Sequence, residues 1–227
     1  MLTLAIDCSA RFCSAALYEE DADRILASAS PDIGRGHAEQ LPFVVQSVFD
    51  AAGVELPAVT RVGVSIGPGS FAGIRVGVAF ARGLALALNV PAIGVGSLEA
   101  IAIPAARRHG RPVMAVLDAR RDCVWVMLAG VDGGIRAPAA ELTPQAAVAL
   151  ALEMKCALSG NGAALLAGLE PALAPHVLSD LAAPLIEDVA RLAARLDPRT
   201  NPPEPRYLRE ADAKPQTGFA LPHEVVV

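Results

Sequence analysis

The residues around position 70 have the composition of an anion-binding turn. Residues 67–70 (Gly-Pro-Gly-Ser) stand between an alternating β-branched segment at 61–66 and a long apolar segment without proline that runs to Leu88. This order predicts a strand, a tight turn and a helix capped by Ser70. Free N–H groups at such a helix start attract anions such as phosphate. The turn alone does not decide the function, because glycines serve a chain reversal equally well.

Two aspartates form a second pattern that suits phosphate chemistry. Asp7 and Asp118 each end a short apolar segment and are followed by a loop that contains an arginine. Such a carboxylate, when it faces a cleft, can hold a metal-bound phosphate, but it can equally cap a turn. With a second glycine turn at 160–162, the candidate cleft residues are Asp7, Gly67, Gly69, Ser70, Asp118, Gly160 and Gly162.

Other catalytic chemistry has weaker support. The four histidines lie far apart in the sequence, without the i, i+4 pair of a helix-borne metal site, and neither a nucleophile elbow nor a P-loop motif occurs. The four cysteines form no CxxC pair, so a zinc ribbon is not indicated. A Ser–His–Asp triad stays open, because triads assemble in space. We expect no metal site and assign no catalytic residue.

The composition limits the fold class and the partners. Of the 227 residues, 53% are hydrophobic and only 4% aromatic, so Ala, Val, Leu and Ile must build the core of a packed α/β protein. The formal net charge of -5 argues against an RNA-gripping surface on this chain alone. No basic leader and no uninterrupted apolar stretch of membrane-spanning length is evident. We expect a cytoplasmic protein.

Periodicity predicts a β-β-β-α-β-α-β-α series in the first half, with antiparallel hairpins at its start because the connections are short. The expected elements are strands at 2–7, 13–18 and 24–30, a helix at 36–52 ended by Gly53, a strand at 61–66, a helix to 88, a strand at 90–95 and a helix capped by Ser97. This order is typical of the ribonuclease-H-like unit of the actin, sugar kinase and Hsp70 class.

The second half repeats the plan. Its expected elements are strands at 114–118 and from Cys123, a turn at 132–134, a helix at 144–153, a strand at 156–159, the glycine turn and an amphipathic helix at 181–196. We therefore predict an α/β protein with two actin-like domains, each a mixed sheet flanked by helices, the second one reduced. The expected ranges are 1–105 and 106–210, with a C-terminal tail at 211–227.

The helix after the first glycine turn has a further feature. Gly73, Gly77 and Ala81 form a stripe of small residues that lets another element approach closely, and apolar side chains flank it. The helix near 37–52 is also rich in Val and Leu. Two such helices side by side exceed what one small domain must cover, which predicts a partner surface. Core packing explains part of the pattern, because one side of each helix must face its own sheet.

Several motifs resemble the TsaB (YeaZ) family of bacterial proteins. They are LAIDCS at 4–9, HAEQLP at 37–42, GPGSFAGIRVG at 67–77, LDARR at 117–121, SGNG at 159–162 and PRYLR at 205–209. The resemblance runs along nearly the whole chain in the same order, and the motif at 67–77 is highly specific. One departure is Ala72, where the family most often has Thr, so the role of that hydroxyl is in doubt.

The resemblance implies two actin-like domains and a role in making threonylcarbamoyladenosine next to the anticodon of tRNAs that read codons starting with A. Family members support the catalytic TsaD subunit, and TsaE joins them using ATP. The resemblance therefore implies a non-catalytic subunit without a cofactor of its own, and leaves open an adenine nucleotide at the junction with the partner subunits. It implies contact with tRNA only through the complex, and no membrane.

The resemblance also implies that the chain binds TsaD, or a second copy of itself, through the helices that begin at His37 and Ser70. The expected partner-surface residues are His37, Leu41, Val45, Val48, Phe71, Ile74 and Val78. The residues alone leave two alternatives. An ATP-dependent small-molecule kinase of the actin-like fold is suggested by the two aspartates and the glycine turns, and a metallopeptidase-like protein is disfavoured by the missing histidine pair.

Overall fold

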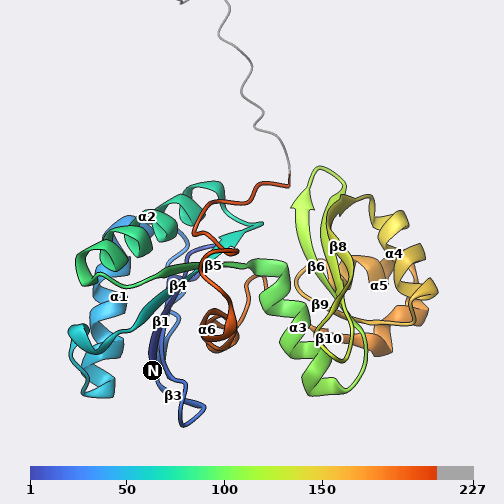
Figure 1. The fold of residues 1–227 in the computed structure, drawn as a ribbon. Coiled ribbons are helices and arrows are strands. Elements are labelled where there is room, and N and C mark those ends of the chain that lie inside the picture. The colour runs from blue at the N-terminus through green and yellow to red at the C-terminus, as the bar shows by residue number, and fades with distance from the viewer. Residues whose placement is uncertain (209–227) are drawn as a thin grey trace, which may run out of the picture.

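The computed structural model describes residues 1–208, which form two five-stranded mixed sheets with helices around them (Figure 1). The first sheet contains β1 (Leu2–Asp7), β2 (Ser14–Glu19), β3 (Arg24–Ala29), β4 (Arg61–Gly67) and β5 (Ala92–Gly96), in the order β3-β2-β1-β4-β5. The second contains β6 (Val113–Arg120), β7 (Cys123–Ala129), β8 (Ile135–Leu142), β9 (Ala157–Ser159) and β10 (Val177–Ser179), in the order β10-β9-β6-β7-β8.

The two sheets share one topology. In each, the first three strands in the sequence are antiparallel, and the fourth and fifth run parallel to the first. The duplication and the ribonuclease-H-like, actin-like fold class are therefore confirmed. The second unit is reduced in the length of β9 and β10, which have three residues each, and keeps the full number of strands.

The helices make three layers around and between the sheets (Figure 1). The helices α1 (His37–Ala52) and α2 (Phe71–Leu88) cover the outer face of the first sheet, and α4 (Pro144–Glu153) and α5 (Ala163–Leu169) cover the outer face of the second. Between the sheets lie α3 (Ser97–His109) and α6 (Ile186–Arg195). Two short 3-10 helices, η1 (Leu56–Ala58) and η2 (Pro171–His176), complete the described elements.

The two middle helices are exchanged between the halves. Helix α3 follows β5 in the chain but packs on β6 and β7 of the second sheet. Helix α6 follows β10 but packs on β1, β2 and β4 of the first sheet. The expected range 106–210 contains α6, which packs on the sheet of the first half. The predicted tail at 211–227 lies outside the described residues.

Small residues let α6 lie directly on β4. A Cβ atom at Gly63 would clash with the Cβ of Ala193 on the helix. Beside this contact, Nη1 of Arg61 donates hydrogen bonds to the carbonyl oxygens of Ala193 (3.1 Å) and Ala194 (2.6 Å). These carbonyls belong to the last turn of α6, where no partner exists within the helix. One residue of the first sheet therefore caps a helix that comes from the end of the chain.

Several local predictions are confirmed and others are wrong. Ser70 caps α2, with its Oγ accepting from the N–H of Gly73 (3.2 Å), and Gly53 ends α1 in the left-handed conformation. Ser97, however, is the first residue of α3 rather than its cap, and its buried Oγ has no hydrogen-bond partner within residues 1–208. The strands β8 and β10 were not predicted. Pro138 in β8 is tolerated because β8 is an edge strand.

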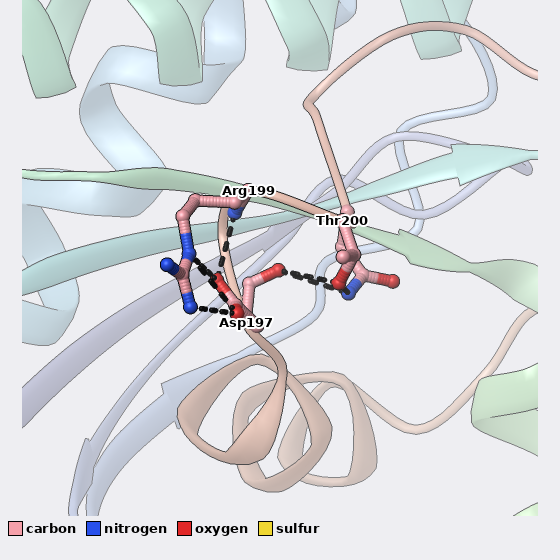
Figure 2. Close-up of polar contacts among 4 residues, drawn as sticks. Asp197, Arg199 and Thr200 are labelled. Carbon is pink, nitrogen blue, oxygen red and sulfur yellow. Dashed lines mark hydrogen bonds and ion pairs between the residues drawn. The ribbon is translucent and has the colours of Figure 1, made fainter.

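A tight polar turn ends α6 and starts the last described segment (Figure 2). Nη2 of Arg199 donates to the carboxylate of Asp197 (2.8 Å), and the hydroxyl of Thr200 donates to the Asp197 carbonyl oxygen (3.3 Å). The hydrogen bond from Arg199 lowers the pKa of the Asp197 carboxyl. The turn sends the chain back over the first sheet, and we call residues 197–208 the C-terminal strap.

The C-terminal strap is attached to the ends of β4 and β5. The N–H of Gly94 donates to the carbonyl oxygen of Asn201 (2.9 Å), and the N–H of Arg206 donates to the carbonyl oxygen of Ile66 (2.7 Å). The side chain of Arg206 also forms an ion pair with Glu99 at the start of α3. The expectation that residues 206–208 lie against the body is confirmed, and Arg209 lies outside the described residues.

The glycine at the β4–α6 contact gives a stability prediction. Gly63→Ala forces a methyl group against Ala193, and we expect it to lower the free energy of unfolding by about 1–3 kcal/mol. Gly83→Ala is the matched control, because nothing lies within 4 Å of a Cβ at this position in α2. Removing a helical glycine there should raise the free energy of unfolding by about 0.5–1 kcal/mol. Urea denaturation of both variants measures the difference, and equal effects would contradict the packing of α6 on β4.

Candidate functional site

A cleft of about 700 Å³ opens between the loops of the two halves. One wall is formed by the loop after β1 and by the start of α2, and the other by the end of β6 and by Asn161. Of the predicted cleft residues, the cleft brings together Gly69, Ser70 and Asp118. Asp7, Gly67, Gly160 and Gly162 are not among the residues that line it.

The two predicted aspartates make the same local turn in different surroundings. Oδ1 of Asp7 accepts the N–H of Ser9 (3.0 Å), and Oδ1 of Asp118 accepts the N–H of Arg120 (2.7 Å). Both therefore cap the turn that follows their strand. Asp118 is exposed in the cleft, whereas Asp7 is completely buried in the first half. Only Asp118 is placed to meet a ligand in the cleft.

The buried carboxyl of Asp7 is not fully hydrogen-bonded. Its Oδ2 has no hydrogen-bond partner within residues 1–208 that meets ordinary geometry. Burial raises the pKa of Asp7 above its ordinary value of 3.8, and hydrogen bonding by Ser9 opposes this only in part. The side chain therefore loses its proton at a higher pH in the folded protein than in the unfolded chain.

The predicted glycines lie against the protein's own chain. A Cβ at Gly69 would clash with the carbonyl oxygen of Ser9, and one at Gly160 would clash with the carbonyl oxygen of Val116. A Cβ at Gly162 would lie 2.8 Å from Cγ1 of Val116, and one at Gly67 would lie 2.7 Å from the carbonyl oxygen of Arg206. In each turn the missing side chain lets the chain contact a neighbouring segment, without any ligand being required.

The first glycine turn is hydrogen-bonded to the loop after β1, and the second is hydrogen-bonded to β6. The N–H of Ser70 donates to the carbonyl oxygen of Ser9 (2.6 Å), and the N–H of Gly162 donates to that of Val116 (3.0 Å). Asn161 Oδ1 also accepts the N–H of Asp118 (3.0 Å). These bonds fix the two walls of the cleft. Ala72, where the family most often has Thr, is exposed on the cleft wall, and the helix is capped without a hydroxyl there.

The side chains chosen for the partner surface are mostly core residues. His37, Leu41, Val45, Val48, Ile74 and Val78 are buried within the chain itself, and Phe71 alone of the seven is exposed. His37 Nε2 lies 3.1 Å from the carbonyl oxygen of Phe12, within hydrogen-bond distance. The stripe of Gly73 and Gly77 lies against Cys8 of the first half. The apolar face selected from the sequence is the one that covers the first sheet.

The outer faces of α1 and α2 nevertheless expose apolar side chains. Phe43 on α1 is 71% exposed and Leu86 on α2 is 84% exposed. By length and composition α2 could cross a membrane, but in the structure it packs on β4. Only 33% of its 18 residues are buried, so the rest of the helix surface is at least partly exposed. A groove of about 440 Å³ runs between the two helices, lined by residues that include Pro42, Val45, Phe49, Leu56, Phe80 and Leu84. Exposed apolar surface of this kind is typical of a site that contacts another protein.

Aromatic and cationic side chains gather at or beside the cleft, and the sequence singled out only Phe71 among them, for the partner surface. Trp125 lines it, and Tyr207 of the strap stacks on Phe71 with ring centroids 5.1 Å apart. The guanidinium of Arg75 lies 3.8 Å from the centre of the Phe71 ring. The rarity of these residue types, one Trp and two Tyr in the chain, could have drawn attention to Trp125 and Tyr207. The contact of Tyr207 with Phe71 could not be predicted, because the strap and α2 are far apart in the sequence.

No three or more His, Cys, Asp or Glu side chains gather as potential metal ligands in the part of the chain that the structure describes. The duplicated topology and the cleft between its two loops define an actin-like protein of two units. The comparisons with known proteins agree with this class. Residues 29–214 match the family model described as TsaD, tRNA N6-adenosine threonylcarbamoyltransferase.

Two solved structures from Pseudomonas aeruginosa match almost throughout. One is a protein described as similar to peptidase YeaZ, with 31% identity, a TM-score of 0.72, and coverage of 92% of this chain and 99% of that one. The other is YeaZ, with 30% identity, a TM-score of 0.70, and coverage of 91% and 100%. This chain belongs to the TsaB (YeaZ) family.

Curated relatives carry the same family name. The tRNA threonylcarbamoyladenosine biosynthesis protein TsaB of Escherichia coli K12 is 34% identical over 137 residues, which are 60% of this chain and 58% of that protein. The TsaB of Haemophilus influenzae is 34% identical over 124 residues, which are 54% of this chain and 51% of that protein. The matches thus span a little over half the length of these relatives. A tRNA N6-adenosine threonylcarbamoyltransferase from Jannaschia is 35% identical over 109 residues, 47% of this chain and 30% of that enzyme.

The raised pKa of Asp7 predicts the pH dependence of one variant. The unfolded chain ionises Asp7 near pH 3.8, whereas the folded chain ionises it only at a higher pH. Between these two pKa values, a rise in pH favours the unfolded state, so Asp7 increasingly lowers the free energy of unfolding. Asp7→Asn removes this effect and keeps an acceptor for the Ser9 N–H. We expect its Tm to exceed that of the wild type near pH 7 and the difference to shrink near pH 4.

The matched control is Asp118→Asn, which makes the same turn on the surface. Calorimetry across this pH range compares the two variants. A Tm difference for Asp7→Asn that is constant with pH, or that grows on acidification, would contradict the raised pKa of Asp7.

Proposed function

We propose that this protein is a non-catalytic subunit of the bacterial complex that forms threonylcarbamoyladenosine next to the anticodon of tRNAs. It acts in the cytoplasm by binding and supporting the catalytic TsaD subunit. Its membership of the TsaB family and its match to the TsaD family model support this role. The observation that carries the proposal is the pairing of two features, the glycine turns packed against the chain itself and the apolar outer surface of α1 and α2.

The glycine turns support a role other than nucleotide chemistry. In both halves, the space that glycine provides is taken by the chain's own backbone, at Ser9 and at Val116. The N–H groups of Ser70 and Gly162 also donate to the chain itself. These groups are therefore committed to holding the two walls in place, which suits a scaffold that presents its surface to a partner.

The outer surface of α1 and α2 suits a partner of related fold. Because residues 29–214 match the TsaD family model, this chain and TsaD proteins share part of their fold. Homologous chains can pair about an approximate twofold axis, with the same helices on both sides, as two identical chains do. Phe43, Leu86 and the groove between the helices are the contacts we assign to this interface. A second copy of this chain would use the same surface.

The remaining partners stay predictions of this proposal. TsaE would join the pair of subunits using ATP, and an adenine nucleotide would bind at their junction rather than to this chain alone. The direct test of the function is reconstitution with purified TsaD, the enzyme that makes the threonylcarbamoyl adenylate, TsaE, ATP and an unmodified tRNA. We expect modified adenosine only when this chain and TsaD are both present. Robust modification by this chain without TsaD would refute a non-catalytic role.

One pair of variants tests the interface. Phe43→Glu places a charge on the exposed surface of α1 and should weaken association with TsaD about tenfold or more, because the charge is desolvated on binding. Leu165→Glu is the matched control, since Leu165 is 45% exposed on α5 in the second half. Titration calorimetry measures both affinities, and equal losses would rule out the α1 and α2 surface. Val48→Glu is unsuitable, because Val48 is buried and a charge there should unfold the protein.

A further inference from the structure

We propose that the rim of the cleft binds a single-stranded segment of tRNA. Trp125, Phe71 and Tyr207 would offer flat faces to bases, and Arg75 and Arg120 would contact phosphates. The inference rests on the proposed function, because a tRNA-modifying complex brings tRNA to this chain. It names a surface separate from the outer faces of α1 and α2 that we assign to the partner protein.

The aromatic residues carry the first part of the argument. The chain has six Phe, two Tyr and one Trp. Phe71 and Trp125 line this cleft, and Tyr207 contacts Phe71 beside it. Phe71 is 49% exposed and Tyr207 is 43% exposed, so their rings are not needed to fill a core. Bases of single-stranded RNA stack on exposed aromatic rings of this kind.

The Trp125 ring is held in place on the opposite wall. Its Nε1 donates to Oε2 of Glu141 on the neighbouring strand β8 (2.9 Å), which fixes the ring plane. The side chain is half-buried and lines the cleft together with Leu117 and Ala119. Its one polar atom is thus already paired, and what remains for a ligand is the aromatic surface.

Arg75 is oriented for an anion. Its guanidinium lies over Phe71 and 5.9 Å from the centre of the Tyr207 ring, and its Nε donates to the Tyr207 hydroxyl (3.0 Å). Within residues 1–208, Arg75 makes no ion pair. Stacking and the Nε bond hold the side chain, so its two Nη groups stay available to a phosphate with little ordering cost.

Arg120 faces the same cleft from a constrained loop. Residues 120–122 all have positive φ, between 52° and 60°, which is uncommon for residues other than glycine. The bond from the Arg120 N–H to Asp118 helps to hold this conformation. Strained loops of this kind are concentrated at functional sites. The loop carries an arginine to the edge of a cleft whose volume suits a nucleoside or a larger ligand.

Single-stranded RNA fits these features better than an acidic protein segment does. Carboxylates would use the arginines but would leave the exposed aromatic surface of Phe71, Trp125 and Tyr207 without a ligand. The net charge of -5 and the Asp118 carboxylate in the cleft oppose a broad electrostatic grip. A few stacked bases and two phosphates would bind this chain weakly by themselves, and more strongly when the partner protein holds the rest of the tRNA.

The test uses the full-length chain, alone and bound to TsaD, with an unmodified tRNA transcript that reads codons starting with A. Ultraviolet crosslinking followed by mass spectrometry should place crosslinks on the peptides of Trp125, Phe71 or Tyr207. Arg75→Ala and Trp125→Ala should each weaken tRNA binding by the complex about tenfold, measured by fluorescence anisotropy. Trp125→Phe should restore binding, because it keeps a ring. Tyr207→Phe keeps the ring but loses the hydroxyl that accepts from Arg75 Nε, so it should weaken binding less than Arg75→Ala does.

Arg24→Ala is the matched control, since Arg24 is an exposed arginine on β3, away from the cleft. It should leave tRNA binding unchanged. Crosslinks confined to other surfaces, equal losses in Arg24→Ala and Arg75→Ala, or the absence of crosslinks both alone and in the complex would overturn the proposal. Weakened binding of TsaD by Arg75→Ala with unchanged tRNA binding would identify a protein contact instead, and would also overturn it.

The reconstituted reaction separates this inference from the proposed function. If the wild-type chain supports modification and the variants raise the KM for tRNA with little change in kcat, both hold. If the wild type supports modification and the KM is unchanged in Arg75→Ala and Trp125→Ala, only the tRNA surface is refuted. Failure of the wild-type chain to support modification would refute the proposed function itself.

Discussion

The structure depends on the exchange of the two middle helices. A mixed sheet of this kind must bury both faces, and neither half covers its inner face with its own last helix. Helix α6 packs on β4 at Gly63, where a methyl group would clash, and Arg61 caps its last turn. Helix α3 covers the second sheet in return, and the two helices also contact each other between the sheets (Figure 1). The position of each half therefore follows from the packing of the other.

The same arrangement explains why the turns contain glycine. Since the sheets are fixed, each turn after the fourth strand of its half meets the first strand or the loop that follows it, and the amides of Ser70 and Gly162 donate to backbone oxygens there. A glycine that admits a phosphate and one that admits a carbonyl oxygen look alike in a sequence, because both answer the same need for close backbone approach. The contacts in the structure distinguish the two cases, and they favour the structural role for Gly69, Gly160 and Gly162.

Much of the fold could be predicted, but which apolar side chains of α1 and α2 are exposed could not. Strong periodicity gave β1 and α4 with their exact bounds, and the duplicated order gave the fold class. The strand β8 was missed because its alanines and Pro138 carry little strand signal. In α2, both the face on the sheet and the outer face are apolar, so hydrophobic pattern could not separate Ile74 from Leu86. No local sequence pattern predicts the exchange of α3 and α6 or the contact of Tyr207 with Phe71, because both join segments that are far apart in the chain.

The same helix links the two surfaces of the protein. The first residue of α2, Phe71, meets the strap and the cleft, the middle of the helix covers the first sheet, and Leu86 near its end lies on the outer surface. Because α2 rests on β4 through glycines, its position is set by the sheet and not by any ligand. A partner bound along the outer face would therefore meet a helix whose first turn is already held at the cleft by Ser9 and stacked against Tyr207. Such a rigid connection suits a subunit that holds a second protein on one side and the substrate of that protein on another.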